Sequence, residues 1–377
     1  MRKPHVAFIS ETKATYGLLT GQGADVVGGA EVQQTLLASE LLKLGYSVTF
    51  LVADFGQPEK VVTSDGIALI KTRPPGGQSN NPIQYLADIR RLFRAMDAAD
   101  ADIYYQRTSA TITGITAAFC KLRSKLFVFS IASNMDLDGT ARKLLKPHFH
   151  VLYQFGLRHA RAIIVQTDDQ KELLKRNFRR DGIVIRSTYS RPTEEEAALE
   201  RNGILWVGNF RHVRRPELFL DLAERLPEYQ FIMVGGSWLS EPLLFDEMKA
   251  RAKSISNIKL VGAVPYDHVG YYFGAAKLFV NTSSIEGFPN TYLQAWSRGL
   301  PIVATFDADG LISKHHLGCH CDSLDELADA ARDFMEDETL RSEAGRRAMK
   351  YVEENHSIEA VTAAYDALFK SLCKKSN

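Results

Sequence analysis

The chain has 377 residues, of which 45% are hydrophobic and 24% are charged. This composition is ordinary for a soluble globular chain and excludes collagen-like and disordered classes, while the length suggests two or three domains of about 100–200 residues. No apolar run approaches the roughly 18 residues that a membrane-spanning helix needs. Four scattered cysteines form no disulfide framework, which is typical of a reducing compartment, so we expect a cytoplasmic protein.

The charges balance over the whole chain but are unevenly distributed. The formal net charge is +1. Residues 101–190 nevertheless carry about twice as many basic as acidic side chains, and residues 191–377 carry an acidic excess. Such a basic segment could attract an anionic acceptor or an acidic membrane surface. It could equally be a set of solvated helix faces, so both interpretations stay open.

The first half of the sequence alternates between strand-like and helix-like segments. A β-rich run at residues 5–10 is followed by a long glycine-containing loop that ends at Gly28-Gly29. Apolar residues then recur at helical spacing over 30–44, and residues 46–52 again resemble a strand. This order predicts a βαβ unit in a parallel sheet. Further strands are expected over residues 102–105, 125–131 and 161–166.

The same alternation begins again after residue 200. Strands are expected over 204–208 and 230–234, with a helix opened by Pro216 between them. More strands are expected over residues 259–261, 277–281 and 301–304. We therefore predict two Rossmann-like doubly wound α/β domains, 1–190 and 201–356, joined by a linker at 191–200. Such domains would bind a ligand in the cleft between them, at the carboxyl ends of both sheets.

A first candidate phosphate site is Gly28-Gly29, which lies between a predicted strand and a predicted helix. Backbone N–H groups and the helix dipole can hold an anion there, and glycine allows close approach. The pair could also be an ordinary loop feature. The stretch 21–26 fails the GxGxxG fingerprint at its last position, and the sequence contains no GxxxxGK[ST] motif. An NAD enzyme and a P-loop ATPase are therefore disfavoured.

A more specific signal is SIEGFPNTYLQAWSRGLPIV, residues 284–303. It joins a predicted strand to a helix entered through Pro289, where Asn290 or Thr291 could cap free backbone donors. Glu286 lies just before this helix and Gln294 within its early turns. The free N–H groups between them suit a diphosphate, which leaves the two side chains for sugar hydroxyls.

With these motifs the sequence resembles the family-4 retaining glycosyltransferases, which have the glycosyltransferase B (GT-B) architecture. The family pattern is a glutamate, seven residues and a second glutamate, with GFP between them and a G-[LV]-P-[IV]-V tail. The resemblance covers nearly the whole chain and implies that a final helix, 357–377, crosses back to the N-terminal domain. Its other motifs are Gly28-Gly-Ala-Glu31, Trp206-Val-Gly208, Arg214-Arg-Pro216 and Gly262-Ala-Val-Pro265.

The resemblance implies a donor-binding role for the residues of the GFP segment. Glu286 would lie beside the donor sugar. Gln294 stands where the family has a glutamate that accepts hydrogen bonds from the nucleotide ribose. Its amide oxygen can still accept but carries no charge, so ribose binding would weaken by about 1 kcal/mol or more. The residues whose backbone would line the donor are Gly287, Phe288, Pro289, Asn290 and Thr291, and Gly28 and Gly29 are also expected to contact it.

The expected phosphate cations depart from the family pattern. Asn209 stands where the family often has an arginine, and Arg214 aligns with its second cation, a lysine. Arg214 keeps the charge and can bind phosphate bidentately. Arg211 could supply the missing cation, or it could be an exposed loop charge. Val261 and Val264 are expected to contact the nucleotide base.

In the first domain the family often has a histidine after the strand predicted over 127–131. Here the sequence is Ala132-Ser-Asn-Met-Asp136. Asn134 and Asp136 are therefore candidate catalytic residues that would contact the transferred sugar or the acceptor. The alternative is that both are ordinary turn residues.

The resemblance implies transfer of a sugar from a nucleotide diphosphosugar to a carbohydrate or lipid-linked acceptor in polysaccharide or glycolipid biosynthesis. A UDP-sugar is the favoured donor and a GDP-sugar is the second choice. Glu286 has no acidic companion at Gln294, so a glycosidase-like carboxylate pair is not evident. We hypothesise front-face attack, with a donor phosphate oxygen taking the acceptor proton. No cofactor or metal is expected, and the alternative is a noncatalytic nucleotide-sugar-binding protein.

Two further features bear on ligands. His315-His-Leu-Gly-Cys-His-Cys321 contains zinc-ligand residue types, but it lacks a CxxC half-site, so a structural role is expected. Arg90, Arg91 and Arg94 lie on a predicted amphipathic helix, and Lys143 and Lys146 add charge. Related enzymes often dock at a membrane, so an anionic membrane surface, at the cytoplasmic face of the inner membrane, is an expected partner. No nucleic-acid reader motif is present, and we expect no nucleic-acid partner.

Overall fold

A computed structural model describes residues 2–22, 27–76, 81–140 and 147–374. The chain divides into two compact units, one of Met1–Ser187 with Ile358–Asn377 and one of Thr188–Ser357. The residues predicted as a linker, 191–200, lie in the second unit and include the short helix α8 (Glu194–Ala197). Lys143, Lys146 and part of the 21–26 stretch lie outside the described residues.

The described residues of the first unit form an eight-stranded sheet in the order β3-β4-β2-β1-β5-β6-β7-β8. Neighbouring strands are parallel except for the antiparallel pair β3 and β4. The strands are β1 (His5–Ile9), β2 (Ser47–Val52), β3 (Lys60–Val62), β4 (Ala68–Lys71), β5 (Ile103–Arg107), β6 (Leu126–Ser130), β7 (Ala162–Val165) and β8 (Ile183–Val184). The helices are α1 (Lys13–Thr20), α2 (Gly29–Lys43), α3 (Pro82–Ala99), α4 (Thr111–Leu122), η1 (Asn134–Asp136), α6 (Pro147–His159), α7 (Asp168–Phe178) and α16 (Ile358–Lys374).

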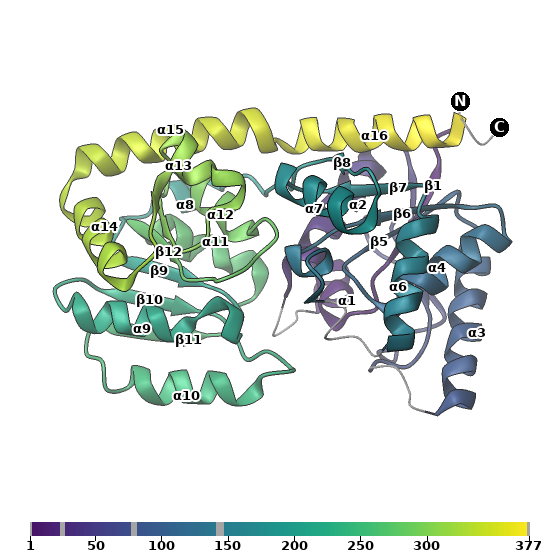
Figure 1. Ribbon diagram of the computed structural model, residues 1–377, viewed down its shortest axis with the longest axis horizontal. Coiled ribbons are helices and arrows are strands. Elements are labelled where there is room, and N and C mark those ends of the chain that lie inside the picture. The colour runs from purple at the N-terminus through teal and green to yellow at the C-terminus, as the bar shows by residue number, and fades with distance from the viewer. Residues whose placement is uncertain (1, 23–26, 77–80, 141–146, 375–377) are drawn as a thin grey trace. The chain divides into compact units, whose positions relative to one another are not determined.

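Helices cover both faces of this sheet (Figure 1). Successive residues of a strand point to opposite faces. On β5, Tyr104 therefore enters the core that packs α3, α4 and α6, whereas Tyr105 enters the core that packs α2 and α16. By the same alternation Arg107, the last residue of β5, lies on the α2 and α16 face.

The second unit contains a six-stranded parallel sheet, in the order β11-β10-β9-β12-β13-β14 among the described residues. The strands are β9 (Ile204–Val207), β10 (Phe231–Val234), β11 (Ile258–Gly262), β12 (Leu278–Asn281), β13 (Ile302–Ala304) and β14 (Gly318–His320). The helices are α8, η2 (His212–Arg214), α9 (Pro216–Arg225), α10 (Pro242–Ala252), α11 (Tyr266–Ala275), α12 (Asn290–Trp296), η3 (Ala308–Gly310), α13 (Leu311–His315), α14 (Leu324–Glu336) and α15 (Glu338–His356). The predicted pair of Rossmann-like α/β units is thus confirmed.

Each sheet has a point where the strand order reverses direction. In the first unit it lies between β1 and β5, and in the second between β9 and β12. Ligands of doubly wound sheets bind at the carboxyl ends of the strands at such a point. These two edges are therefore where functional residues are expected within each unit.

Three elements that the sequence analysis did not predict are short. Helix α1 occupies part of the predicted loop before Gly28, and the Thr12 side chain caps it. Strands β3 and β4 have three and four residues and form a hairpin at the sheet edge. The loop prediction was wrong at α1, because eight residues that include Gly17 are too few to show a clear helical period.

A polar cluster attaches α16 to the strands of its own unit. Asp366 accepts hydrogen bonds from Lys3 (2.6 Å), Tyr46 (2.7 Å) and Lys370. Burial alone would raise the pKa of Asp366, but these hydrogen bonds outweigh it and lower the pKa to about 2. Its side chain is 17% exposed, so solvent screens this charge only in part.

The variant Asp366→Asn is expected to lower the free energy of unfolding by roughly 2 kcal/mol at neutral pH. A lowered pKa stabilises the fold above the unfolded value of 3.8 and ceases to do so as the pH falls through about 2. The difference between wild type and variant should therefore shrink between pH 4 and pH 2, as urea unfolding would measure. A difference that is constant over this range would contradict the assignment.

Candidate functional site

The segment between β12 and α12 is fixed to the end of β9 by hydrogen bonds. Thr282 Oγ1 donates to the carbonyl oxygen of Arg214 (2.6 Å) and accepts from Trp206 Nε1 (3.0 Å). Arg215 Nε donates to the carbonyl oxygen of Thr282 (2.7 Å). Ser284 N and Oγ both donate to the carbonyl oxygen of Val213. The two loops at the reversal point of the second sheet therefore form one rigid assembly.

Glu286 and Arg214 form an ion pair in this assembly. Arg214 Nη1 lies 3.1 Å from Glu286 Oε1, and Ser283 Oγ donates to the same carboxylate at 2.9 Å. The two side chains are 22% and 15% exposed, so the pair is shielded but not sealed from solvent. Partial burial makes such a pair stronger than one on the surface.

Arg211 lies close to Arg214 and is poorly neutralised. Its Nε is buried and has no hydrogen-bond partner among the described residues, and Glu241 approaches it only to 4.0 Å. The guanidinium lies over the Trp238 ring, 5.0 Å from its centroid. Burial first and then the charge of Arg214 lower the pKa of Arg211. A bound anion would relieve both effects, which favours Arg211 as the missing phosphate cation.

The absence of a side chain at Gly208 leaves space for the side chain of Arg214. A Cβ there would lie 3.1 Å from Arg214 Cδ and 3.2 Å from the Trp206 ring. Gly235, at the end of β10, has a φ of +151° and approaches so closely that its Cβ would lie 1.8 Å from the carbonyl oxygen of Gly208. Asn209 follows Gly208 directly, so the structure places it beside these close backbone contacts.

The aromatic side chain of the GFP segment packs in the core of the second unit. The Phe288 ring is buried and stacks on His356 at 5.0 Å between ring centroids. Helix α12 begins at Asn290 with Pro289 as its N-cap residue and without a side-chain capping bond. The expected capping by Asn290 or Thr291 was therefore wrong, because the helix starts one residue earlier than such a cap requires. Thr291 Oγ1 is buried without a hydrogen-bond partner among the described residues.

Gln294 has a hydrogen-bond acceptor, Oε1, that no described residue occupies and that the expected contact with the ribose requires. Its Nε2 donates to the Tyr266 hydroxyl oxygen at 3.4 Å, whereas its Oε1 is buried without a partner among the residues described. An unsatisfied buried acceptor costs about 1–3 kcal/mol, which a ligand hydroxyl would recover. The expected base contacts, Val261 in β11 and Val264 after it, are both half-buried against the core that includes α12.

The remaining predicted residues lie in the first unit. Gly28 is the N-cap of α2, and Gly29 is its first residue. A Cβ on Gly28 would lie 2.4 Å from Glu31 Oε2, so a side chain there would displace that carboxylate from the helix start. Asn134 Oδ1 accepts a hydrogen bond from Gln170 Nε2 at 3.2 Å.

Asp136 is buried and hydrogen-bonded within its own unit. Burial raises its pKa, and its carboxylate accepts bonds from Ser109 Oγ (2.6 Å) and from the N–H groups of Ala132 (2.9 Å) and Ser133 (3.1 Å). It is 4% exposed. Oδ2 thus holds the start of the η1 turn and Oδ1 binds Ser109, so Asp136 has a structural role here, and its catalytic role stays a prediction.

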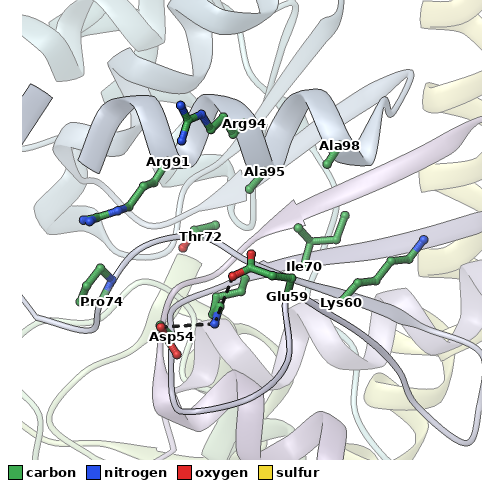
Figure 2. Close-up of a pocket in the computed structure, with 11 residues that line it drawn as sticks. Asp54, Glu59, Lys60, Ile70, Thr72, Pro74, Arg91, Arg94, Ala95 and Ala98 are labelled. Atoms are coloured by element: carbon green, nitrogen blue, oxygen red, sulfur yellow. Dashed lines mark ion pairs between the residues drawn. The ribbon is translucent and has the colours of Figure 1, made fainter. Parts of the chain in front are cut away.

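A pocket of about 530 Å³ opens at the edge of the first sheet, between α3 and the β3–β4 hairpin (Figure 2). Lys71 lines it and pairs with Asp54 (3.5 Å) and Glu59 (3.3 Å). Arg91 and Arg94, expected on an amphipathic helix, both line this pocket from α3. The sequence analysis missed the pocket because it missed the hairpin that forms one wall.

The His315–Cys321 segment contains two adjacent thiols. The Sγ atoms of Cys319 and Cys321 are 3.7 Å apart, and the His315 ring packs on Tyr351 at 4.8 Å. The hydrogen bond that the Cys321 thiol donates lowers the pKa of Cys319 to about 7 and raises that of Cys321. Burial raises the pKa of Cys120 and Cys373.

Iodoacetamide at pH 7 is therefore expected to alkylate Cys319 at least about tenfold faster than the other cysteines. The thiolate is the reactive form, so the rate at Cys319 should rise up to about pH 8 and then level off. Peptide mass spectrometry would measure it. The variant Cys321→Ala removes the donor and should slow the reaction at pH 7, and equal labelling of Cys120 would contradict the assignment.

None of the helices in the described ranges is both long and apolar enough to cross a bilayer.

Comparison with known sequences identifies the family of the chain. The family described as "Glycosyl transferases group 1" matches residues 201–337, and the "Glycosyl transferase 4-like domain" matches residues 28–187. The two matches correspond to the two units and include the Arg214–Glu286 pair and Gly28-Gly29. The chain therefore belongs to the family-4-type glycosyltransferases of GT-B fold.

Particular relatives agree with this assignment. The lipopolysaccharide core biosynthesis mannosyltransferase LpsB of Rhizobium meliloti is 29% identical over 180 residues, 44% of this chain and 51% of that protein. The chain thus spans about half the length of this curated relative. Sucrose-phosphate synthase from Thermosynechococcus elongatus has a similar structure (TM-score 0.81, 17% identity, 99% of this chain and 100% of that chain). HepE of Anabaena, in complex with UDP and glucose, is also similar (TM-score 0.74, 14% identity, 98% and 100%).

Proposed function

We propose that this protein is a retaining glycosyltransferase that moves a sugar from a nucleotide diphosphosugar to a carbohydrate or lipid-linked acceptor. The observation that carries the proposal is the shielded Arg214–Glu286 pair, beside the poorly neutralised Arg211, at the reversal point of the second sheet. Two cations and an adjacent carboxylate suit a diphosphate with a polar sugar attached. A UDP-sugar is the favoured donor, a GDP-sugar the second choice, and HepE offers an example of a similar fold that holds UDP and glucose.

In this proposal each group has one task. Arg211 and Arg214 stabilise the charge that develops on the leaving diphosphate, so no metal is required for that purpose. Glu286 accepts a hydrogen bond from the donor sugar, and Gln294 Oε1 accepts one from the ribose. The acceptor hydroxyl attacks the anomeric carbon on the face that the diphosphate leaves. Its proton passes to a phosphate oxygen, and the configuration at the anomeric carbon is retained.

The nucleotide specificity is tested by thermal shift with UDP, GDP and ADP and with their common sugar conjugates. UDP should raise the melting temperature most. Release of UDP from a bound UDP-sugar, in the presence of a panel of saccharide acceptors, then tests transfer. Binding without any release would support the noncatalytic alternative, and the absence of nucleotide binding would reject both.

We propose that the acceptor belongs to polysaccharide or glycolipid assembly, which the name of LpsB supports. Contact with an anionic membrane would fit a lipid-linked acceptor. On α3, Ile83 is 79% and Leu86 54% exposed, and Arg90 and Arg94 lie on the same helix. Apolar and basic side chains together favour an anionic lipid surface.

Sedimentation with vesicles of phosphatidylglycerol and phosphatidylcholine tests this contact. Binding is expected at low salt, with loss at high salt and with phosphatidylcholine alone. The variant Ile83→Asp should weaken it. If the protein does not sediment with anionic vesicles at low salt, the membrane proposal is wrong.

A further inference from the structure

Arg107, the last residue of β5, is a buried cation without a counter-charge. The residue is 8% exposed, and its Nε is fully buried without a hydrogen-bond partner among the residues that the structure describes. Within the described part of the chain, its guanidinium forms no ion pair. Other shielded arginines differ: Arg73 pairs with Glu11 at 2.7 Å, and Arg298 pairs with Glu196 at 2.6 Å. A charge that is mostly buried and unpaired is unfavourable, and it would be stabilised by an anionic partner.

Arg107 lies in a row of polar residues at one edge of the first sheet. It pairs in register with Ser130 at the end of β6. On the other side Gln106 pairs with Ile9, so the next residue of that chain segment, Ser10, follows opposite Arg107. By strand alternation these side chains lie on the face covered by α2 and α16. The row lies at the carboxyl end of the sheet and spans the reversal point between β1 and β5.

The two covering helices supply polar groups beside this row. From α2, Gln34 Nε2 donates to Ser10 Oγ at 3.5 Å, and its Oε1 is buried without a partner among the described residues. From α16, the Tyr365 hydroxyl lies 3.2 Å from that of Tyr105. Burial raises the pKa of Tyr365 well above its ordinary value, and the positive charge of Arg107 opposes that rise, which places the guanidinium near this hydroxyl.

The unsatisfied groups need two kinds of ligand atom. Arg107 needs an anion, and phosphate or carboxylate oxygens fit its planar donors. Gln34 Oε1 needs a hydrogen-bond donor, which an anion lacks but a sugar hydroxyl provides. A sugar that carries a phosphate or a carboxylate supplies both.

We propose that Arg107 binds an anionic group, phosphate or carboxylate, on the acceptor sugar. The identification of the ligand as the acceptor rests on the proposed transferase function. In that function the donor diphosphate is already assigned to Arg211 and Arg214 of the second unit. Arg107 belongs to the first unit, whereas Arg211 and Arg214 belong to the second, so we assign it a separate anion, and the donor diphosphate is the other source that the test below distinguishes. Arg107 and Gln34 would then select a charged acceptor over a neutral one.

Inorganic phosphate is the probe for this site. Phosphate is titrated into the full chain saturated with UDP, so that Arg211 and Arg214 are occupied, and the melting temperature is recorded. Phosphate should raise the melting temperature of the wild type and of Arg176→Met, a control for an exposed arginine, but not that of Arg107→Met. Without phosphate, Arg107→Met should melt no lower than the wild type, because it removes an unpaired charge.

Calorimetry with UDP separates the two possible sources of the anion. Unchanged UDP affinity in Arg107→Met supports the acceptor assignment, whereas a tenfold loss assigns the anion to the donor and overturns it. If the wild type gives no phosphate shift, or Arg107→Met keeps the full shift, the site is wrong. If UDP does not bind at all, the proposed function fails, and the phosphate comparison without UDP still decides the site. If Arg107→Met does not fold, Arg107→Lys takes its place. Phosphate should then raise the melting temperature of Arg107→Lys at least threefold less than that of the wild type.

Discussion

Replacement of Glu286 by alanine is expected to reduce sugar transfer at least about a thousandfold while nucleotide binding remains largely intact. Glu286 is held by Arg214 and Ser283 at a fixed position, and in the proposed mechanism it contacts the sugar, not the nucleotide. Its removal therefore takes away a transition-state interaction and relieves Arg214 of an internal competitor. Nucleotide release in steady-state assays measures the first effect, and calorimetry with UDP measures the second.

Two comparisons make this test specific. The variant Glu286→Gln keeps the shape and one acceptor but loses the charge, so it should fall between wild type and alanine. The variant Glu224→Ala breaks a surface pair with Arg251 and should leave transfer unchanged. Turnover in Glu286→Ala that equals wild type would reject the assignment of Glu286 to the reaction.

Much of the fold could be predicted from the sequence because its signals are local. The strand at residues 204–208 and the proline-initiated helix after it are short periodic patterns, and they correspond to β9 and α9. Helix α1 and the β3–β4 hairpin were missed because each is too short for periodicity to register. The pocket beside α3 was not predicted either, because the β3–β4 hairpin forms one of its walls.

The candidate site, like the fold, could be predicted from the sequence only in part. Glu286 and Arg214 were each selected from a motif, but their ion pair depends on Thr282, which joins two loops distant in sequence. Asp136 was selected because it follows the strand after which the resembled family often has a histidine, and its three hydrogen bonds, which join Ser109 to the start of a turn, could not be seen in the sequence. Arg107 gave no sequence signal, because a buried cation is recognised only by the absence of a counter-charge around it in three dimensions.

Arg214→Ala is expected to weaken UDP binding by a factor of ten to a hundred and to reduce transfer further. A bidentate contact between a guanidinium and a phosphate is lost, and the unpaired Glu286 carboxylate then repels the diphosphate. Uridine, which has no phosphate, should bind wild type and variant equally. Arg214→Lys should recover part of the UDP affinity, since it restores charge without the planar donors.

The double variant Arg214→Ala/Glu286→Ala separates these two causes. If repulsion by Glu286 contributes, the double variant should bind UDP more tightly than Arg214→Ala alone, although less tightly than Glu286→Ala. Arg211 would then be the main remaining phosphate cation, and Arg211→Ala added to the double variant should remove most of the residual affinity. Equal UDP binding by wild type and Arg214→Ala would show that the diphosphate does not contact this arginine.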